Sequence, residues 1–340
     1  MPKRSASASS QVVIDMHTHY LPAPLLRALE RRTVAPRIVN RDGALFIEYG
    51  PRSAAPLQPV FTDAAEIVRR MEEAGIDQAL LSVTIPGVDW LEADEAVEVA
   101  EACNEETALL TARYPGRIFG LATVPLQFPE ECPAVLRRAA DLGLKGSMIY
   151  SNVAGAHLDD PSRRPFFAAA AEAGLPILLH PTYPICAPTV AVHGMIEMVG
   201  FLFDTTTAAL RLVFDGLYDR HPNLVFIVPH AGSLIPYFVG RIDHFGAARP
   251  GSTGTLSSNA SDHIRKLYVD TVSDWPAALQ LCLDFFGPDR IMFGSDHPFW
   301  PMTTARQAID QMTAGDDVKA AILYENAQRV FHLEPASVPS

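Results

Sequence analysis

The chain has little positive charge. Of its 340 residues, 27 are lysine or arginine and 39 are aspartate or glutamate, which leaves a formal net charge of −12 at pH 7. Binding to nucleic acid or to an anionic membrane surface depends on clustered basic side chains, and the sequence has no such cluster. We expect neither of these partners. An anionic substrate would depend on local positive charge, from a metal ion and a few placed arginines.

Cysteine is scarce, and long apolar runs are missing. The four cysteines show no Cys-x-x-Cys spacing, so neither a zinc knuckle nor a disulfide framework is indicated. The most apolar stretch, residues 224–240, is interrupted by two prolines, a histidine and a glycine, which makes it a poor membrane span. Residues 1–10 are basic and lack the apolar segment of a secretory signal. We interpret them as a disordered leader and expect a cytoplasmic protein.

Apolar, strand-like runs alternate with helical patterns along the whole chain. The runs are continuous, as is typical of parallel strands that are covered on both faces. Strands are expected near 12–20, 77–84, 118–124, 144–150, 175–180, 223–230, 266–272 and 290–295. Helices are expected near 63–74, 92–114, 130–142, 162–173, 197–220, 234–245, 275–286 and 318–332.

Eight strands alternating with helices predict an α/β protein with a (β/α)8 barrel of the TIM type. A composition of 48% hydrophobic residues supports one large core, so we expect a single domain over residues 11–336. Residues 21–62 interrupt the alternation and predict a small lid-like insertion after the first strand, with a hairpin that turns at Asp42-Gly43. An open doubly wound sheet is the alternative, but no glycine-rich phosphate loop follows the first strand.

Histidines and an aspartate stand where several of these strands end. His17 and His19 close the first strand and share one face of it, because side chains repeat every second residue. Such a pair alone is weak evidence for a metal, since two histidines at a strand end can simply be hydrogen-bonded. His180, His230 and Asp296 end three further apolar runs, and a closed barrel would bring all these strand ends together.

Further motifs accompany these strand ends, and together they are specific. They are Val124-Pro125-Leu126, Ile177-Leu178-Leu179-His180-Pro181, His230-Ala231-Gly232, Val239-Gly240-Arg241-Ile242-Asp243 and Phe293-Gly294-Ser295-Asp296-His297-Pro298-Phe299. With them the chain resembles, over most of residues 12–333, the amidohydrolase superfamily of the amidohydrolase-2 type. Within that superfamily it resembles the metal-dependent decarboxylases typified by 2-amino-3-carboxymuconate-6-semialdehyde decarboxylase.

The resemblance implies one divalent ion, zinc in the first place and manganese as the alternative, held by His17, His19, His180 and Asp296. Three neutral imidazoles and one carboxylate are a zinc-compatible set. Binuclear relatives carry a bridging lysine at the end of the fourth strand, whereas Lys145 lies about four residues before that end. We therefore expect a single ion. For Asp296 the alternative reading is a helix N-cap.

The resemblance also assigns roles to residues around the ion. His230 and Asp296 are the candidate proton carriers. Arg241 corresponds to an arginine that reaches across a dimer interface toward the substrate carboxylate, and Arg52 lies near another substrate-binding arginine. His297 is expected to line the pocket, at a position where the decarboxylase has tyrosine. A guanidinium offers the two-pronged donor that a carboxylate accepts.

We predict a metal-dependent nonoxidative decarboxylase of a small aromatic or unsaturated carboxylic acid, active as a homodimer or a larger homo-oligomer. The same site could hydrolyse a lactone, an amide or a similar bond, or hydrate a substrate, because an ion and a histidine serve those reactions equally well. A catalytically inert binding protein is a further alternative. The retention of every expected ligand and of His230 disfavours it.

Overall fold

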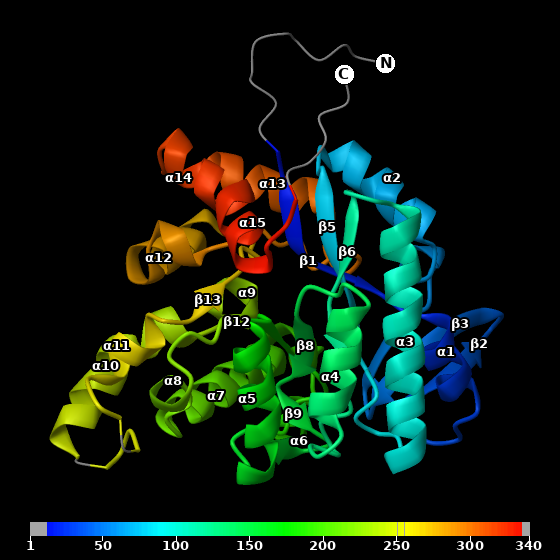
Figure 1. The fold of residues 1–340 in the computed structure, drawn as a ribbon, viewed down its shortest axis with the longest axis horizontal. Coiled ribbons are helices and arrows are strands. Elements are labelled where there is room, and N and C mark those ends of the chain that lie inside the picture. The colour runs from blue at the N-terminus through cyan, green and yellow to red at the C-terminus, as the bar shows by residue number, and fades with distance from the viewer. Residues whose placement is uncertain (1–11, 250, 255, 335–340) are drawn as a thin grey trace, which may run out of the picture.

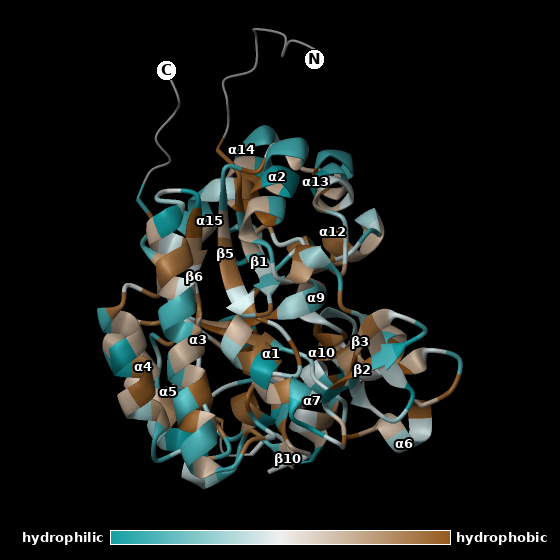
Figure 2. Cartoon of the chain, turned by 90° about the vertical axis from the view of Figure 1, so that its right-hand side faces the viewer, coloured by the Kyte–Doolittle hydropathy of each residue, from teal (hydrophilic) through white to brown (hydrophobic). Residues whose placement is uncertain are grey.

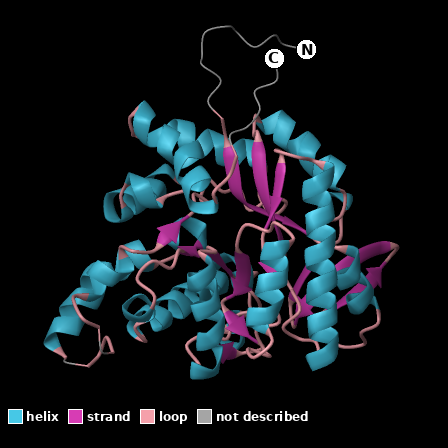
Figure 3. Ribbon diagram, viewed as in Figure 1, coloured by secondary structure: helices cyan, strands magenta, loops and turns pink. Residues whose placement is uncertain are grey.

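A computed structural model describes residues 12–249, 251–254 and 256–334 (Figure 1). The expected leader over residues 1–10 lies outside the described residues. Helices surround a central set of strands, as expected for an α/β protein (Figure 3). The described part of the chain has no helix with the length and apolar character needed to cross a bilayer.

The central strands are parallel and form two ladders. The first ladder runs in the order β1-β5-β6 and the second in the order β13-β12-β11-β8-β7. These strands are β1 (Ile14–Tyr20), β5 (Gln78–Val83), β6 (Ile118–Gly120), β7 (Ala122–Thr123), β8 (Ser147–Tyr150), β11 (Ile177–His180), β12 (Phe226–Val228) and β13 (Tyr268–Val269). The strand expected over 118–124 is thus divided in two.

Backbone contacts connect the two ladders at both ends. The amide of Leu121, between β6 and β7, donates to the carbonyl of Leu81 in β5 over 2.8 Å. At the other end, Ile291 forms a parallel bridge with Val269, and the amide of Met16 donates to the carbonyl of Phe293 over 2.9 Å. The segment expected as a strand over 290–295 therefore lies between β13 and β1, although it forms isolated bridges rather than a regular strand.

The helices lie outside these strands, and several carry apolar residues on one side and polar residues on the other (Figure 2). They are α1 (Ala23–Glu30), α2 (Ala64–Ala74), α3 (Ala93–Arg113), α4 (Cys132–Asp141), α5 (Arg164–Ala173), α6 (Ala187–Val190), α7 (Phe201–Phe214), α8 (Leu217–Arg220), α9 (Pro229–Gly232), α10 (Ile235–Ala248), α11 (Ala260–Ile264), α12 (Pro276–Phe286), α13 (Met302–Gln311), α14 (Asp316–Ala320) and α15 (Asn326–Phe331).

Two expected helices are divided. The pattern over 197–220 becomes a π-helical turn, Ile196–Gly200, followed by α7 and α8. Gly216 separates α7 from α8 because its φ of 79° lies in the left-handed region, which glycine adopts without a steric penalty. The closing helix over 318–332 is likewise interrupted by a π-helical turn, Ala321–Glu325. Helices α1, α6, α9, α11 and α13 were not expected from the sequence.

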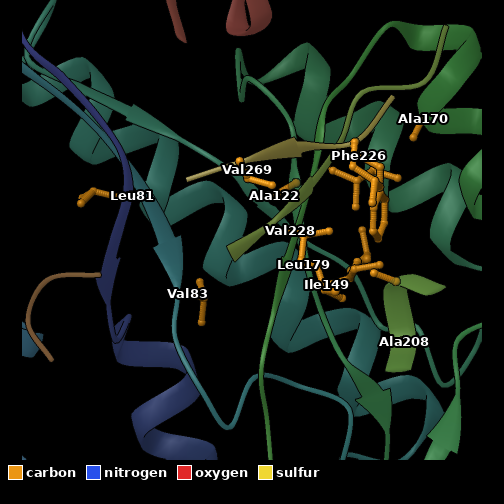
Figure 4. Close-up of a cluster of buried hydrophobic side chains, with 14 of the residues drawn as sticks. Leu81, Val83, Ala122, Ile149, Ala170, Leu179, Ala208, Phe226, Val228 and Val269 are labelled. Carbon is orange, nitrogen blue, oxygen red and sulfur yellow. The ribbon is translucent and has the colours of Figure 1, made fainter. Parts of the chain in front are cut away.

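Buried side chains fall into two clusters because residues alternate between the faces of each strand. One cluster packs the strands against the helices, and Figure 4 shows part of it around Leu179, Phe226 and Val228. The second cluster includes at least one residue from every central strand segment except β7, among them Met16, Leu80, Phe119, Met148, Leu178, Ile227, Tyr268 and Met292. These eight side chains therefore point toward one another on the inner side of the strands.

The segment after β1 forms a separate antiparallel sheet of β2 (Arg37–Arg41), β3 (Ala44–Gly50) and β4 (Ser53–Pro56). The predicted hairpin at Asp42-Gly43 is confirmed, because Arg41 pairs with Ala44 across that turn. The third strand, β4, was not expected. A short hairpin of β9 (Asn152–Val153) and β10 (Ala156–His157) follows β8.

Candidate functional site

Four of the predicted side chains meet at the carboxyl ends of the central strands. His17 and His19 come from β1, His180 ends β11, and Asp296 follows the segment between β13 and β1. One possible ligand atom from each residue lies within 4.8 Å of the others. Asp296 Oδ1 is 3.0 Å from His19 Nε2, 3.4 Å from His17 Nε2 and 3.7 Å from His180 Nε2.

The second nitrogen of each imidazole is held from outside the cluster. His17 Nδ1 contacts Asp270 Oδ2 over 2.6 Å, and His19 Nδ1 contacts Ser82 Oγ over 2.8 Å. His180 Nδ1 lies 2.8 Å from the carbonyl oxygen of its neighbour in the chain. A carbonyl and a carboxylate only accept, so Nδ1 of His17 and His180 carries the proton. Their Nε2 atoms then carry no proton, and their lone pairs point toward the centre of the four-residue cluster.

Burial and the neighbouring charges together determine the protonation of this cluster. Burial lowers the pKa of His19 to about 4 and that of His180 to about 3, so both are neutral at pH 7. Burial lowers the pKa of His17 too, but the charges of Asp296 and Asp270 outweigh it and raise that pKa. Burial would raise the pKa of Asp296, whereas the charge of His17 and the nearby imidazoles hold that pKa well below its ordinary value.

The arrangement fits a divalent cation. Nε2 of His17 and Nε2 of His19 lie only 2.9 Å apart, and the Nε2 atom of His180 is buried without a hydrogen-bond partner among the described residues. Lone pairs and a carboxylate crowded in this way repel one another unless a cation lies between them. Imidazole nitrogens with one carboxylate are a common ligand set for zinc, and imidazole also suits other transition metals.

His230 lies next to this cluster. Its Nε2 atom is 3.3 Å from Asp296 Oδ2, the carboxylate oxygen that faces away from the other imidazoles. His230, Ala231 and Ser233 have φ values of 56°, 52° and 56°, and Gly232 has one of 73°. Four consecutive residues in this sparsely populated region form a strained turn rather than a helix, as is common where a backbone positions a functional group.

Asp270 connects this turn to the cluster, although it was not expected from the sequence to belong to the site. Besides its contact with His17, it accepts a hydrogen bond from the amide of Ala231 over 2.9 Å and from that of Val272 over 3.0 Å. It is fully buried. Its position directly after the strand-like run Leu267-Tyr268-Val269 is the same signal that identified His180 and Asp296, so it could have been found.

A cavity of about 580 Å³ opens onto the cluster. His180, His230 and Asp296 line it, whereas His17 and His19 are fully buried and do not. Most of the other lining side chains are apolar or aromatic, and β3 and β4 of the insertion contribute to the wall. They include Ile85, Met198, Phe201, Leu202, Leu234, Leu281, Phe299 and Trp300.

The three predicted substrate-binding residues lie outside the lining of this cavity. The guanidinium of Arg241 stacks on the ring of Phe245 at 4.7 Å, and that of Arg52 donates to the carbonyl of Ala191 over 2.7 Å. His297 is 5% exposed, and burial followed by the charge of Arg70 lowers its pKa to about 4. A substrate contact of any of these three stays a prediction.

The cluster predicts one bound ion. Elemental analysis of the purified protein should find about one divalent ion per chain, because one set of four ligands is present among the described residues. His180→Ala should lose most of the metal. Cys186→Ala is the control, since Cys186 lies outside the cluster. Two ions per chain at full occupancy would contradict a mononuclear site.

Asp270 predicts a change in metal affinity without the loss of a ligand. In Asp270→Asn the side-chain NH2 group can face Nδ1 of His17. It would donate to Nδ1 and so favour the tautomer with the proton on Nε2, which cannot bind metal. Affinity measured against a chelator should fall by about 10- to 100-fold. Asp274→Asn, an exposed aspartate on the same loop, should leave affinity unchanged. Equal affinities of Asp270→Asn and the wild type would show that Asp270 does not orient His17.

Comparisons with known proteins agree with this geometry. The chain is 29% identical over 302 residues to 2-amino-3-carboxymuconate-6-semialdehyde decarboxylase of Dictyostelium discoideum. The aligned region covers 84% of this chain and 81% of that protein. It is similar to the crystal structure of 5-carboxyvanillate decarboxylase from Sphingomonas paucimobilis, with a TM-score of 0.85, 29% identity and coverage of 95% of this chain and 100% of that one.

A third similar protein is dihydroxybenzoic acid decarboxylase from Polaromonas sp. JS666, whose structure contains manganese and the inhibitor 2-nitroresorcinol. Its TM-score is 0.82 and its identity 26%, over 95% of this chain and 97% of that one. The predicted resemblance to metal-dependent decarboxylases is thus confirmed. A family model described as amidohydrolase matches residues 14–333, and the chain belongs to that family.

Proposed function

We propose that the protein is a metal-dependent nonoxidative decarboxylase of a small aromatic or unsaturated carboxylic acid. The observation that carries the proposal is the contact of His230 with Asp296 at the point where the ligand cluster opens into an apolar cavity. A cation bound by the cluster would hold the substrate carboxylate, His230 could carry a proton beside it, and the cavity has room for a ring. The similar proteins reported above, all decarboxylases, support the same reaction.

Decarboxylation requires a proton at the carbon that loses the carboxylate. The bond between that carbon and the carboxylate breaks, carbon dioxide leaves, and the electron pair left on the carbon takes up the proton. His230 Nε2 lies on the cavity side of Asp296 and can hold this proton between itself and Oδ2. A bound divalent ion would supply the positive charge that holds the anionic substrate beside these two groups.

The apolar wall contributes to the same reaction. Phe201, Leu202 and Phe299 exclude water from the cavity and hold a planar substrate by its ring faces. A carboxylate loses more solvation than neutral carbon dioxide does when it enters such surroundings, so the wall favours the products. The insertion over 21–62, which contributes Tyr49, Ala54 and Ala55 to the lining, acts in this proposal as a lid.

Finer features of the fold belong to the same proposal. We propose a closed (β/α)8 barrel in one domain over residues 11–336, supported by the bridges of Ile291 and Thr18 and by the inner cluster of eight side chains.

Zinc is proposed as the ion because the site is rich in imidazole, and manganese, present in the Polaromonas structure, is the alternative. The four cysteines are unpaired, which agrees with the reducing cytoplasm as its location.

Product analysis tests the reaction. Metal-loaded protein incubated with carboxylated phenols, pyridines and muconates should release carbon dioxide without consuming water. His230→Gln should keep its metal and lose at least ~100-fold in turnover, which is the low end of what a proton-transfer group supplies. Hydrolysis or hydration products without carbon dioxide would support the alternative reactions of this site. Near-normal turnover of His230→Gln would exclude His230 as the proton carrier.

Arg241 is proposed to act in the cavity of a second copy of the chain. It lies on α10 four residues after Tyr237, which lines the cavity mouth and is 78% exposed, so both side chains lie on one face of that helix. A dimer that packs along this face would bring Arg241 to the partner's substrate carboxylate. It would supply the positive charge that the cavity of a net-acidic protein needs.

The arrangement predicts an activity that depends on assembly. Dilution below the dimer dissociation constant should lower specific activity, and Arg241→Ala should raise KM more than it lowers kcat. Arg249→Ala is the matched control, because Arg249 is also exposed and stacks on the same ring of Phe245, at 5.0 Å. A fully active monomer, or identical kinetics of both variants, would remove Arg241 from the site.

A further inference from the structure

The outer wall of the cavity carries a carboxylate that the proposed reaction does not use. Glu197 belongs to the π-helical turn Ile196–Gly200 and lines the same cavity as Asp296. Asp296 is 4% exposed, whereas Glu197 is exposed to solvent. Glu197 therefore lies nearer the mouth of the cavity, and Asp296 lies at its bottom. Among the described residues, no lysine or arginine lines this cavity.

Glu197 is fixed in place by the insertion. Its Oε1 atom accepts a hydrogen bond of 2.6 Å from Ser53 Oγ, and Ser53, at the start of β4, is 3% exposed. The other carboxylate oxygen, Oε2, has no hydrogen bond or ion pair with a described residue. A charged acceptor is therefore held at a defined position in the cavity with one oxygen available to a ligand.

Tyr49 adds a second available polar atom to the same wall. It lines the cavity, and its hydroxyl is buried without a hydrogen-bond partner among the described residues. Burial and then the charge of Glu197 raise the pKa of Tyr49, so the hydroxyl stays protonated and lies within the field of that carboxylate. A buried hydroxyl without a partner is costly, and a bound ligand can satisfy it.

Arg52 does not neutralise Glu197. It precedes Ser53 in the chain, but its guanidinium donates to the carbonyl of Ala191 over 2.7 Å and forms no ion pair with Glu197. The described part of the cavity thus has a cation-binding cluster at its bottom and an uncompensated negative charge near its mouth. If a substrate binds with its carboxylate at the bottom of the cavity, its opposite end lies near the carboxylate of Glu197.

We propose that Glu197, held by Ser53 and flanked by Tyr49, is a specificity-determining residue. It selects carboxylic acids that carry a hydrogen-bond donor, a hydroxyl or an amino group, at the end away from the carboxylate, and it rejects acids with a second carboxylate there. The inference rests on the proposed function for the orientation of the substrate. A donor satisfies Oε2, whereas a second carboxylate places two like charges together and leaves both unpaired.

Calorimetric binding to the zinc-loaded full chain tests the proposal. The probes are benzoate, 3- and 4-hydroxybenzoate, and benzene-1,3- and 1,4-dicarboxylate, whose ring substituents are too far from the first carboxylate to chelate the same ion. The better hydroxybenzoate should bind at least about tenfold more tightly than benzoate, the gain expected of a hydrogen bond to a charged group. Both dicarboxylates should bind more weakly than benzoate.

Glu197→Gln should reduce the preference for the hydroxyl group and improve binding of the dicarboxylates toward that of benzoate. Ser53→Ala, which leaves Glu197 charged but unsupported, should reduce the hydroxyl preference and keep the rejection of dicarboxylates. Glu95→Gln is the matched control, because it removes one negative charge from α3, outside this cavity. All five dissociation constants should be unchanged in this control.

The outcomes separate this inference from the proposed function. Equal binding of benzoate and the hydroxybenzoates by the wild type, or equal rejection of dicarboxylates by the wild type and Glu197→Gln, would overturn the role of Glu197, whatever the turnover. Absence of carbon dioxide release from every acid tested, with the expected pattern of dissociation constants, would overturn the decarboxylase proposal and leave Glu197 as a selector of ligands.

Discussion

Electrostatic repulsion among closely spaced, buried ligand atoms determines how this site is built. Three imidazoles and a carboxylate converge within 4.8 Å at a buried position, where no lysine or arginine among the described residues forms an ion pair with the carboxylate. Asp296 is the centre of this cluster, since its Oδ1 atom faces the three metal-binding imidazoles and its Oδ2 atom faces His230. A divalent ion at this place would offset the cost of bringing these groups together.

Second contacts hold the cluster in the geometry that the ion requires. Asp15 on β1 accepts hydrogen bonds from the amide and the hydroxyl of Ser295, over 3.0 and 2.5 Å, and so connects the strand of His17 to the segment of Asp296. Asp270 connects His17 to the strained turn of His230. The candidate metal ligands and His230, the proposed proton carrier, are therefore parts of one hydrogen-bonded unit, so a substitution at one of them should also affect the others.

The sequence predicted the parts of this site that depend on strand position. His17 and His19 could be placed together because side chains on a strand repeat every second residue. His180 and Asp296 could be added because both follow apolar runs, and the carboxyl ends of parallel strands lie at one edge of the sheet. Features that depend on side-chain contacts could not be predicted. Glu197 lies on a turn at the start of a region predicted as one helix, and its position depends on a hydrogen bond from Ser53, 144 residues earlier in the chain.

X-ray absorption at the metal edge of the metal-loaded full chain would identify the ligands of the ion. We expect three imidazole nitrogens and one carboxylate around a single ion, with nitrogens at about 2.0–2.1 Å if the ion is zinc. Sulfur at about 2.3 Å, or fewer than two imidazoles, would contradict the assignment of His17, His19, His180 and Asp296 as the metal site.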